Sequence, residues 1–81
     1  MAFIEKELLL SRVKYLVKIN EKPGLSCVNP TIVDKINSMI EKEELLSFMQ
    51  VESVFNYLVE KSVDQPNELD RYASEILDFI N

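Results

Sequence analysis

The residues that most often perform chemistry are scarce in this chain, which has no histidine and a single cysteine, Cys27. Histidine is the commonest general base and, through its imidazole, the commonest metal ligand. Without it, Ser-His-Asp and Cys-His arrangements cannot form within the chain. Without a base to activate it, Cys27 is best interpreted as a small buried apolar residue. A zinc site made from one cysteine and no histidine would be unusual. We therefore expect no enzyme activity, no cofactor and no metal site.

Carboxylates are the most numerous group with functional potential, with 14 acidic against 9 basic residues and a net charge of −5. Residues 1–40 carry six bases and four acids, a net charge of +2, whereas residues 41–81 carry three bases and ten acids, a net charge of −7. The acids lack the spacing and the glycine of a calcium-binding loop. An acidic surface attracts basic proteins and repels phosphates, so we expect a basic protein partner and no nucleic-acid binding.

The candidate binding residues lie on the exposed sides of the last two predicted helices and at the turn before them. Acidic or polar residues recur there at four-residue spacing, which places them on one side of each helix. Tyr57 lies off the apolar stripe, and tyrosines are common in binding hot spots. The alternative interpretations are a solvated face that maintains solubility and, for Tyr57, a half-buried flanking residue. The predicted partner-binding set is Glu41, Glu44, Glu52, Asn56, Tyr57, Glu60, Asp70 and Asp78.

Helices are the elements that must position these residues. One glycine and three prolines are too few turn signals for a β-sandwich or barrel. Helical periodicity predicts an all-α, compact four-helix bundle in a single domain over residues 1–81, with helices at about 2–20, 30–44, 48–62 and 66–80. Short connections make the last three helices antiparallel neighbours. Residues 13–19 also alternate as a strand would, although the residues before them favour helix.

Two helix starts have clear local signals. Asn29 can cap free backbone amides, and Pro30 suits the first helical position. Ser47 and Gln50 fit a capping box, which predicts a turn near residues 45–47 between the second and third helices. Because no glycine or proline separates these two helices, one long continuous helix is the alternative.

The first helix carries two neighbouring apolar stripes, and this wide apolar arc predicts a central position in the bundle. If one stripe stayed uncovered, a second copy of the chain could close it. The loop that follows, residues 25–29, is apolar enough to be expected to pack back on the bundle. One stripe consists of Ile4, Leu8, Tyr15 and Ile19, and its neighbour consists of Leu9, Val13, Leu16 and Val17.

The remaining features concern compartment and function. The longest apolar run, at residues 8–10, is too short to span a bilayer, the acidic start is unlike a signal peptide, and one cysteine cannot form an internal disulfide. We therefore expect a cytoplasmic protein that does not enter membranes. In size and charge alone the chain resembles bacteriocin immunity proteins, antitoxins and phage-encoded inhibitors.

These observations predict a small protein-binding module of bacterial or phage origin, an inhibitor, immunity-type or regulatory protein that acts through an acidic helical face. The alternative is a homo-oligomeric structural subunit, in its simplest form a homodimer, with the first helix at the seam.

Overall fold

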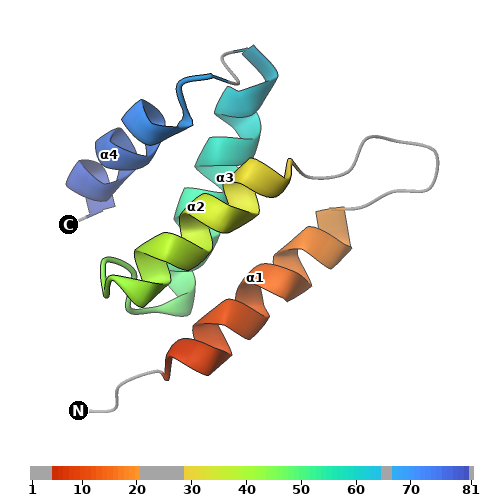
Figure 1. Ribbon diagram of the computed structural model, residues 1–81, viewed down its shortest axis with the longest axis vertical. Coiled ribbons are helices and arrows are strands. Elements are labelled where there is room, and N and C mark those ends of the chain that lie inside the picture. Colours follow the sequence, from red (N-terminus) through yellow and green to blue (C-terminus); the bar gives the residue numbers. More distant parts are fainter. Residues whose placement is uncertain (1–4, 21–28, 65–66, 81) are drawn as a thin grey trace.

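The computed structural model, which describes residues 5–20, 29–64 and 67–80, contains four helices (Figure 1). They are α1 (Lys6–Asn20), α2 (Pro30–Glu41), α3 (Phe48–Asp64) and α4 (Leu69–Ile80). Successive helices run in opposite directions, which is the up-down arrangement of a four-helix bundle (Figure 1). The predicted all-α fold is confirmed, and residues 13–19 are helical.

The central helix is α3, which packs against each of the other three helices. Its Val54, Phe55 and Leu58 are fully buried in the apolar core. The prediction that the first helix is central is wrong, because α1 buries only Leu9, Val13 and Leu16, while Leu10 and Val17 are partly buried. At the edge of a bundle a helix has neighbours on one side only, so the second apolar stripe of α1 faces outward.

The predicted helix starts are confirmed by their hydrogen bonds. The Asn29 side chain accepts a 2.9 Å hydrogen bond from the Thr31 backbone N–H at the start of α2. At the start of α3, Ser47 Oγ accepts from the Gln50 N–H at 3.2 Å, and Gln50 Oε1 accepts from the Leu46 N–H at 2.7 Å. This is a capping box whose return bond reaches one residue further back than usual. It confirms that α2 and α3 are separate helices.

The turn between α2 and α3 begins earlier than predicted, because α2 ends at Glu41 rather than at residue 44. The next-but-one residue, Glu43, has a φ of 62°, in the left-handed region. Its N–H bonds to the Ile40 carbonyl at 3.0 Å, and the Glu44 N–H bonds to the Met39 carbonyl at 2.9 Å. This pair of bonds is a Schellman motif, in which glutamate occupies the position that glycine usually takes.

Two further boundaries differ from the prediction. Helix α3 continues to residue 64, two residues beyond the expected end, and α4 begins at Leu69 rather than at residue 66. Glu68 precedes α4, and its carbonyl accepts the Tyr72 N–H at 3.1 Å as the first helical bond. The predicted start of the first helix at residue 2 and the inward packing of the loop with Cys27 lie outside the described residues.

Candidate protein-binding surface

Two tyrosines meet where α3 packs against α4. The rings of Tyr57 from α3 and Tyr72 from α4 lie edge to face, with centroids 6.1 Å apart and an interplanar angle of 73°. This is a favoured geometry for aromatic pairs. Tyr72 is buried, whereas Tyr57 is half-buried at the edge of the interface. The pair therefore holds Tyr57 in a defined position at the surface.

Two cations lie against these rings. Lys61 Nζ is 5.5 Å from the Tyr57 centroid and 5.6 Å from the Tyr72 centroid. The Arg71 guanidinium lies 4.8 Å from the Tyr72 centroid, and it donates a 3.0 Å hydrogen bond to the Tyr72 hydroxyl. All three distances to the ring centroids are within the range of cation–π attraction. Much of the positive charge on this side is thus engaged within the protein.

The carboxylates of Glu68, just before α4, and of Glu75, within α4, complete the cluster. Glu68 and Glu75 both form ion pairs with Arg71, with nitrogen–oxygen distances of 2.9 Å and 3.8 Å, respectively. The Tyr57 hydroxyl donates a 3.2 Å hydrogen bond to Glu75, which joins the surface of α3 to that of α4. Desolvation, followed by this hydrogen bond and the charge of Glu75, raises the pKa of Tyr57. The bond to Tyr72 and the charge of Glu68 raise the pKa of Arg71.

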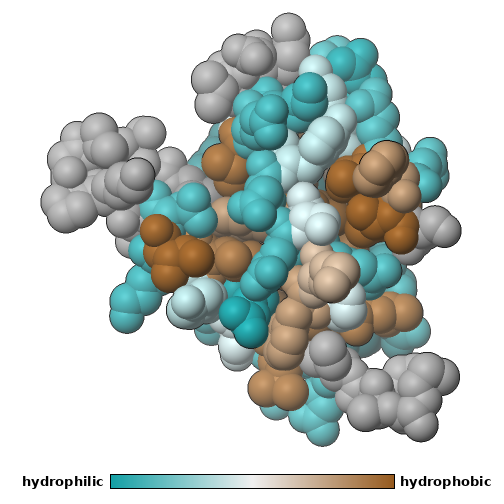
Figure 2. Space-filling model, turned by 180° about the vertical axis from the view of Figure 1, so that it is seen from behind, coloured by the Kyte–Doolittle hydropathy of each residue, from teal (hydrophilic) through white to brown (hydrophobic). Residues whose placement is uncertain are grey.

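An open depression of about 250 Å³ lies beside this cluster, lined by Tyr57, Glu75, Ile76 and Phe79. Phe79 stands at its rim with 85% of its surface exposed. The apolar residues seen on the right of Figure 2, on the side of α4, lie next to a hydrophilic band that runs down the middle of this face. An exposed phenylalanine beside a fixed tyrosine offers apolar contact area together with polar groups.

Two of the predicted binding residues form ion pairs with residues of other helices. Glu52 pairs with Arg12 of α1 at 3.7 Å, and Asp70 pairs with Lys35 of α2 at 3.0 Å. These ion pairs orient the two carboxylates toward different edges of the bundle. Glu52 and Asp70 therefore do not form one acidic face.

Glu60 and Asp78 are exposed and have no ion-pair partner in the part of the chain that the structure describes. The hydrogen bond between Tyr57 and Glu75 places these two residues side by side on the antiparallel helices α3 and α4. Glu60 follows Tyr57 by three residues and Asp78 follows Glu75 by three, so they lie about 9 Å apart along the helix axes. The two free carboxylates thus bracket the tyrosine cluster. Asn56 is exposed one turn before Glu60.

The last two predicted residues, Glu41 and Glu44, lie at the opposite end of α3. Both are exposed, at the end of α2 and in the turn that follows it. The start of α3 and Glu60 are separated by about 18 Å of helix. The structure therefore groups Tyr57 and Glu60 with Asp78, and it leaves Glu41 and Glu44 apart.

Sequence reasoning missed several members of this surface. Arg71 and Glu75 were not singled out, although they are the polar neighbours of Tyr72 along α4. Phe79 carried a usable signal, because it is an apolar residue on the flank of the α4 stripe and not within it. Tyr72 belongs to the buried stripe, so its contact with two cations is visible only when α3 and α4 are packed together.

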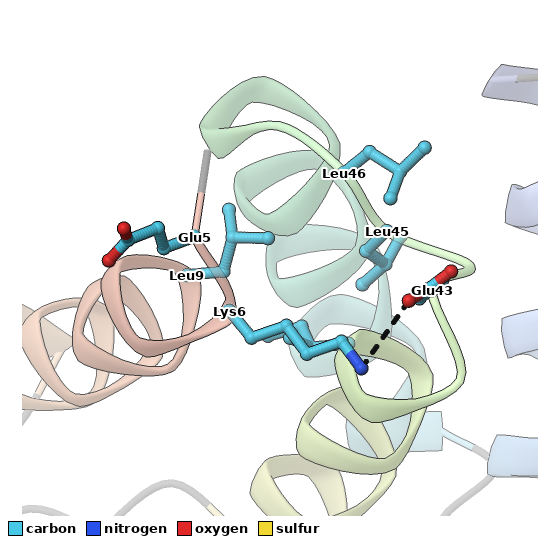
Figure 3. Close-up of a pocket in the computed structure, with 7 residues that line it drawn as sticks. Glu5, Lys6, Leu9, Glu43, Leu45 and Leu46 are labelled. Carbon is cyan, nitrogen blue, oxygen red and sulfur yellow. Dashed lines mark ion pairs between the residues drawn. The ribbon is translucent and has the colours of Figure 1, made fainter. Parts of the chain in front are cut away.

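A second hollow, of about 420 Å³, lies at the other end of the bundle (Figure 3). Lys6 of α1 and Glu43 of the α2–α3 turn face each other across it, with 3.5 Å between charged atoms. Lys6 Nζ also donates a 3.2 Å hydrogen bond to the Glu41 carbonyl. Leu9 and Leu45 line the hollow and belong to the buried core. Its one ion pair and apolar walls suggest no chemistry, and we interpret it as a packing gap where the chain turns.

No other evidence assigns a ligand or a relative. The described residues contain no group of three or more histidine, cysteine, aspartate or glutamate side chains that could hold a metal ion. None of the described helices is both long and apolar enough to cross a bilayer. Comparisons with protein-family models, with curated proteins and with solved structures found no match for this chain.

Proposed function

We propose that this protein is a non-enzymatic binding module, of the inhibitor, immunity or regulatory kind, that acts by occupying a basic protein partner. The binding surface is the α3–α4 face, which consists of Tyr57, Glu60, Lys61, Arg71, Glu75, Asp78 and Phe79. The observation that supports it is the 85% exposure of Phe79 beside Tyr57 over an open depression. Aromatic residues and arginine carry much of the energy at protein interfaces.

The charge of this face supports a basic partner. Lys61 and Arg71 are engaged with the tyrosine rings, and Arg71 is also engaged with carboxylates. Glu60 and Asp78, which have no internal ion pair within the described residues, provide the free charge. Free carboxylates around an aromatic centre speed encounter with a positive surface and set its orientation.

Preorganisation of the anchor residues also supports this function. Tyr57 is held by the hydrogen bond to Glu75, by the Tyr72 ring and by Lys61. A side chain that is already ordered loses little conformational entropy when a partner binds. The surface is thus suited to rigid docking. The proposal places this binding in the cytoplasm, because a single cysteine cannot form an internal disulfide and the longest apolar run, at residues 8–10, is too short to span a bilayer.

The test begins with affinity purification of the full chain from its native cell, followed by mass spectrometry. With the purified partner, Phe79→Ala and Tyr57→Ala should each weaken binding by roughly 30-fold, the size of a hot-spot loss. Met49→Ala removes an apolar side chain that is 77% exposed at the far end of α3, and it should leave affinity unchanged.

Charge reversal provides the second measurement. Glu60→Lys and Asp78→Lys should slow association, more strongly at low salt, whereas Glu44→Lys at the other end should have little effect. The proposal fails if the purification recovers no protein partner. It also fails if the partner binds Phe79→Ala and Tyr57→Ala as tightly as it binds the wild type.

A further inference from the structure

Helix α1 has an apolar stripe that no other helix covers. Leu8, Tyr15 and Ile19 are 53%, 52% and 53% exposed, although Leu9, Val13 and Leu16 on the adjoining stripe are buried. Spacings of seven and four residues place the three exposed side chains on one side of the helix. Figure 2 shows a group of apolar residues on the left, on the side of α1. One helix therefore presents a core-like stripe to its surroundings.

The middle of this stripe is ordered by Arg12. Its guanidinium lies 5.3 Å from the Tyr15 centroid and 4.5 Å from the centroid of Phe48 on α3, and it pairs with Glu52 at 3.7 Å. A shallow groove of about 270 Å³ runs beside it, lined by Leu8, Ser11, Arg12, Tyr15 and Phe48. The stripe is thus a shaped surface with Arg12 and Tyr15 at its centre and an apolar residue at each end.

The flanking charges indicate what covers it. Glu7 lies near the start of α1 and Lys14 and Lys18 in its second half, and each lysine falls within about 20° of Glu7 around the helix. Neither Glu7 nor Lys18 has an ion-pair partner within the described residues. This flank is negative at one end and positive at the other. It is complementary to a copy of itself that runs in the opposite direction.

We propose that a second copy of the chain covers this stripe, with the two α1 helices antiparallel about a twofold axis. An axis between Arg12 and Tyr15 places Leu8 on Ile19 of the other copy, and each Arg12 near the other Tyr15. Glu7 then lies near Lys18 of the other copy, and the helix dipoles oppose. Lys14 lies next to the axis and faces Lys14 of the other copy, whereas a parallel pair would bring all three residues of this flank against their like-charged equivalents.

The expected dimer is reversible. Helix α1 has 15 residues and is about 22 Å long, so the contact is smaller than in permanent dimers. We therefore expect dissociation in the roughly micromolar range, with dimer forming as concentration rises. The inference is independent of the function proposed above, because Phe48 and Glu52 face α1 whereas Tyr57 and Lys61 face α4.

Sedimentation velocity of the purified full chain over a concentration series tests this proposal. The wild type should shift from monomer to dimer, and Tyr15→Asp should stay monomeric. Phe79→Asp changes an aromatic residue that is more exposed than Tyr15, at 85% against 52%, and lies on α4, and it should dimerise as the wild type does. Circular dichroism would check that each variant keeps its helical content.

Charge exchange tests the antiparallel arrangement. Glu7→Lys and Lys18→Glu should each weaken dimerisation by about tenfold or more, since symmetry places two like-charged contacts in each dimer. The double variant restores opposite charges and should dimerise like the wild type. The proposal is overturned if the wild type remains monomeric at the highest concentration, or if the double variant is as weak as the single variants. Dimerisation that Phe79→Asp abolishes would also overturn it.

Discussion

Replacing Glu43 with glycine should stabilise the protein relative to replacing it with alanine. Glu43 adopts a φ of 62° in the Schellman motif that ends α2. A side chain with a Cβ is crowded in the left-handed region, whereas glycine enters it freely. The alanine variant keeps the Cβ, so the comparison isolates the cost of this conformation.

The size of the effect follows from two opposing terms. A residue with a Cβ loses roughly 1–2 kcal/mol in the left-handed region. Glycine loses about 0.5–1 kcal/mol because it has more freedom in the unfolded chain. Both variants also remove the ion pair between Lys6 and Glu43, whose side chains are 44% and 70% exposed, respectively. Its loss is the same in both variants and therefore cancels in the comparison. We expect the glycine variant to be more stable than the alanine variant by about 1 kcal/mol, from the difference of these terms.

Urea denaturation of both variants, followed by circular dichroism, measures the difference in the free energy of unfolding. In thermal melts the same difference corresponds to a Tm shift of about 4–8 °C for a domain of this size. Glu44→Gly and Glu44→Ala form the matched control, because Glu44 does not have a positive φ. There the glycine variant should be the less stable of the two. If Glu43→Ala proves as stable as Glu43→Gly, the strain argument is wrong.

Three other predictions concern the core, a buried amide and the tyrosine cluster. Phe55 is fully buried, so Phe55→Ala should lower the free energy of unfolding by about 3–5 kcal/mol in urea denaturation. Asn37 Oδ1 is buried and accepts no hydrogen bond from the described residues, so Asn37→Leu should raise Tm, and a lower Tm would contradict this reasoning. Folding raises the pKa of Tyr57 by desolvation and by the bond to Glu75, so this contribution to stability is complete below the ordinary pKa of 10.0 and is lost as the pH rises through the folded-state pKa. In an NMR titration of the Tyr57 ring, Glu75→Gln should lower that pKa, and an unchanged midpoint would show that Glu75 has no influence on it.

The local features of this fold were predictable because they depend on neighbours in the sequence. The Asn29 cap and the Ser47–Gln50 box each involve groups within four residues of one another. The buried stripe of α2 was also predictable, since a helix with one narrow apolar side can bury no other. Its members are Ile32, Ile36, Met39 and Ile40. The end of α2 was predicted too late, because a left-handed glutamate leaves no compositional signal of the kind that glycine leaves.

The candidate surface was only partly predictable. Tyr57 and Glu60 could be selected from their place on the helix, yet the same reasoning selected Glu52 and Asp70, which pair with Arg12 and Lys35. These pairs join residues 40 and 35 positions apart in the chain. Helical periodicity says which residues are exposed on an isolated helix, but it does not say which neighbouring helix lies beside them.

By itself the sequence determined the number of helices, the caps that start α2 and α3, and the uneven charge of the two halves, because these depend on residue type and short-range spacing. Only the tertiary structure decided which of the two apolar stripes of α1 is buried. The stripes are adjacent and similar in composition, so the choice depends on where α2 and α3 pack. That packing buries Leu9, Val13 and Leu16, and it leaves Leu8, Tyr15 and Ile19 as an open surface.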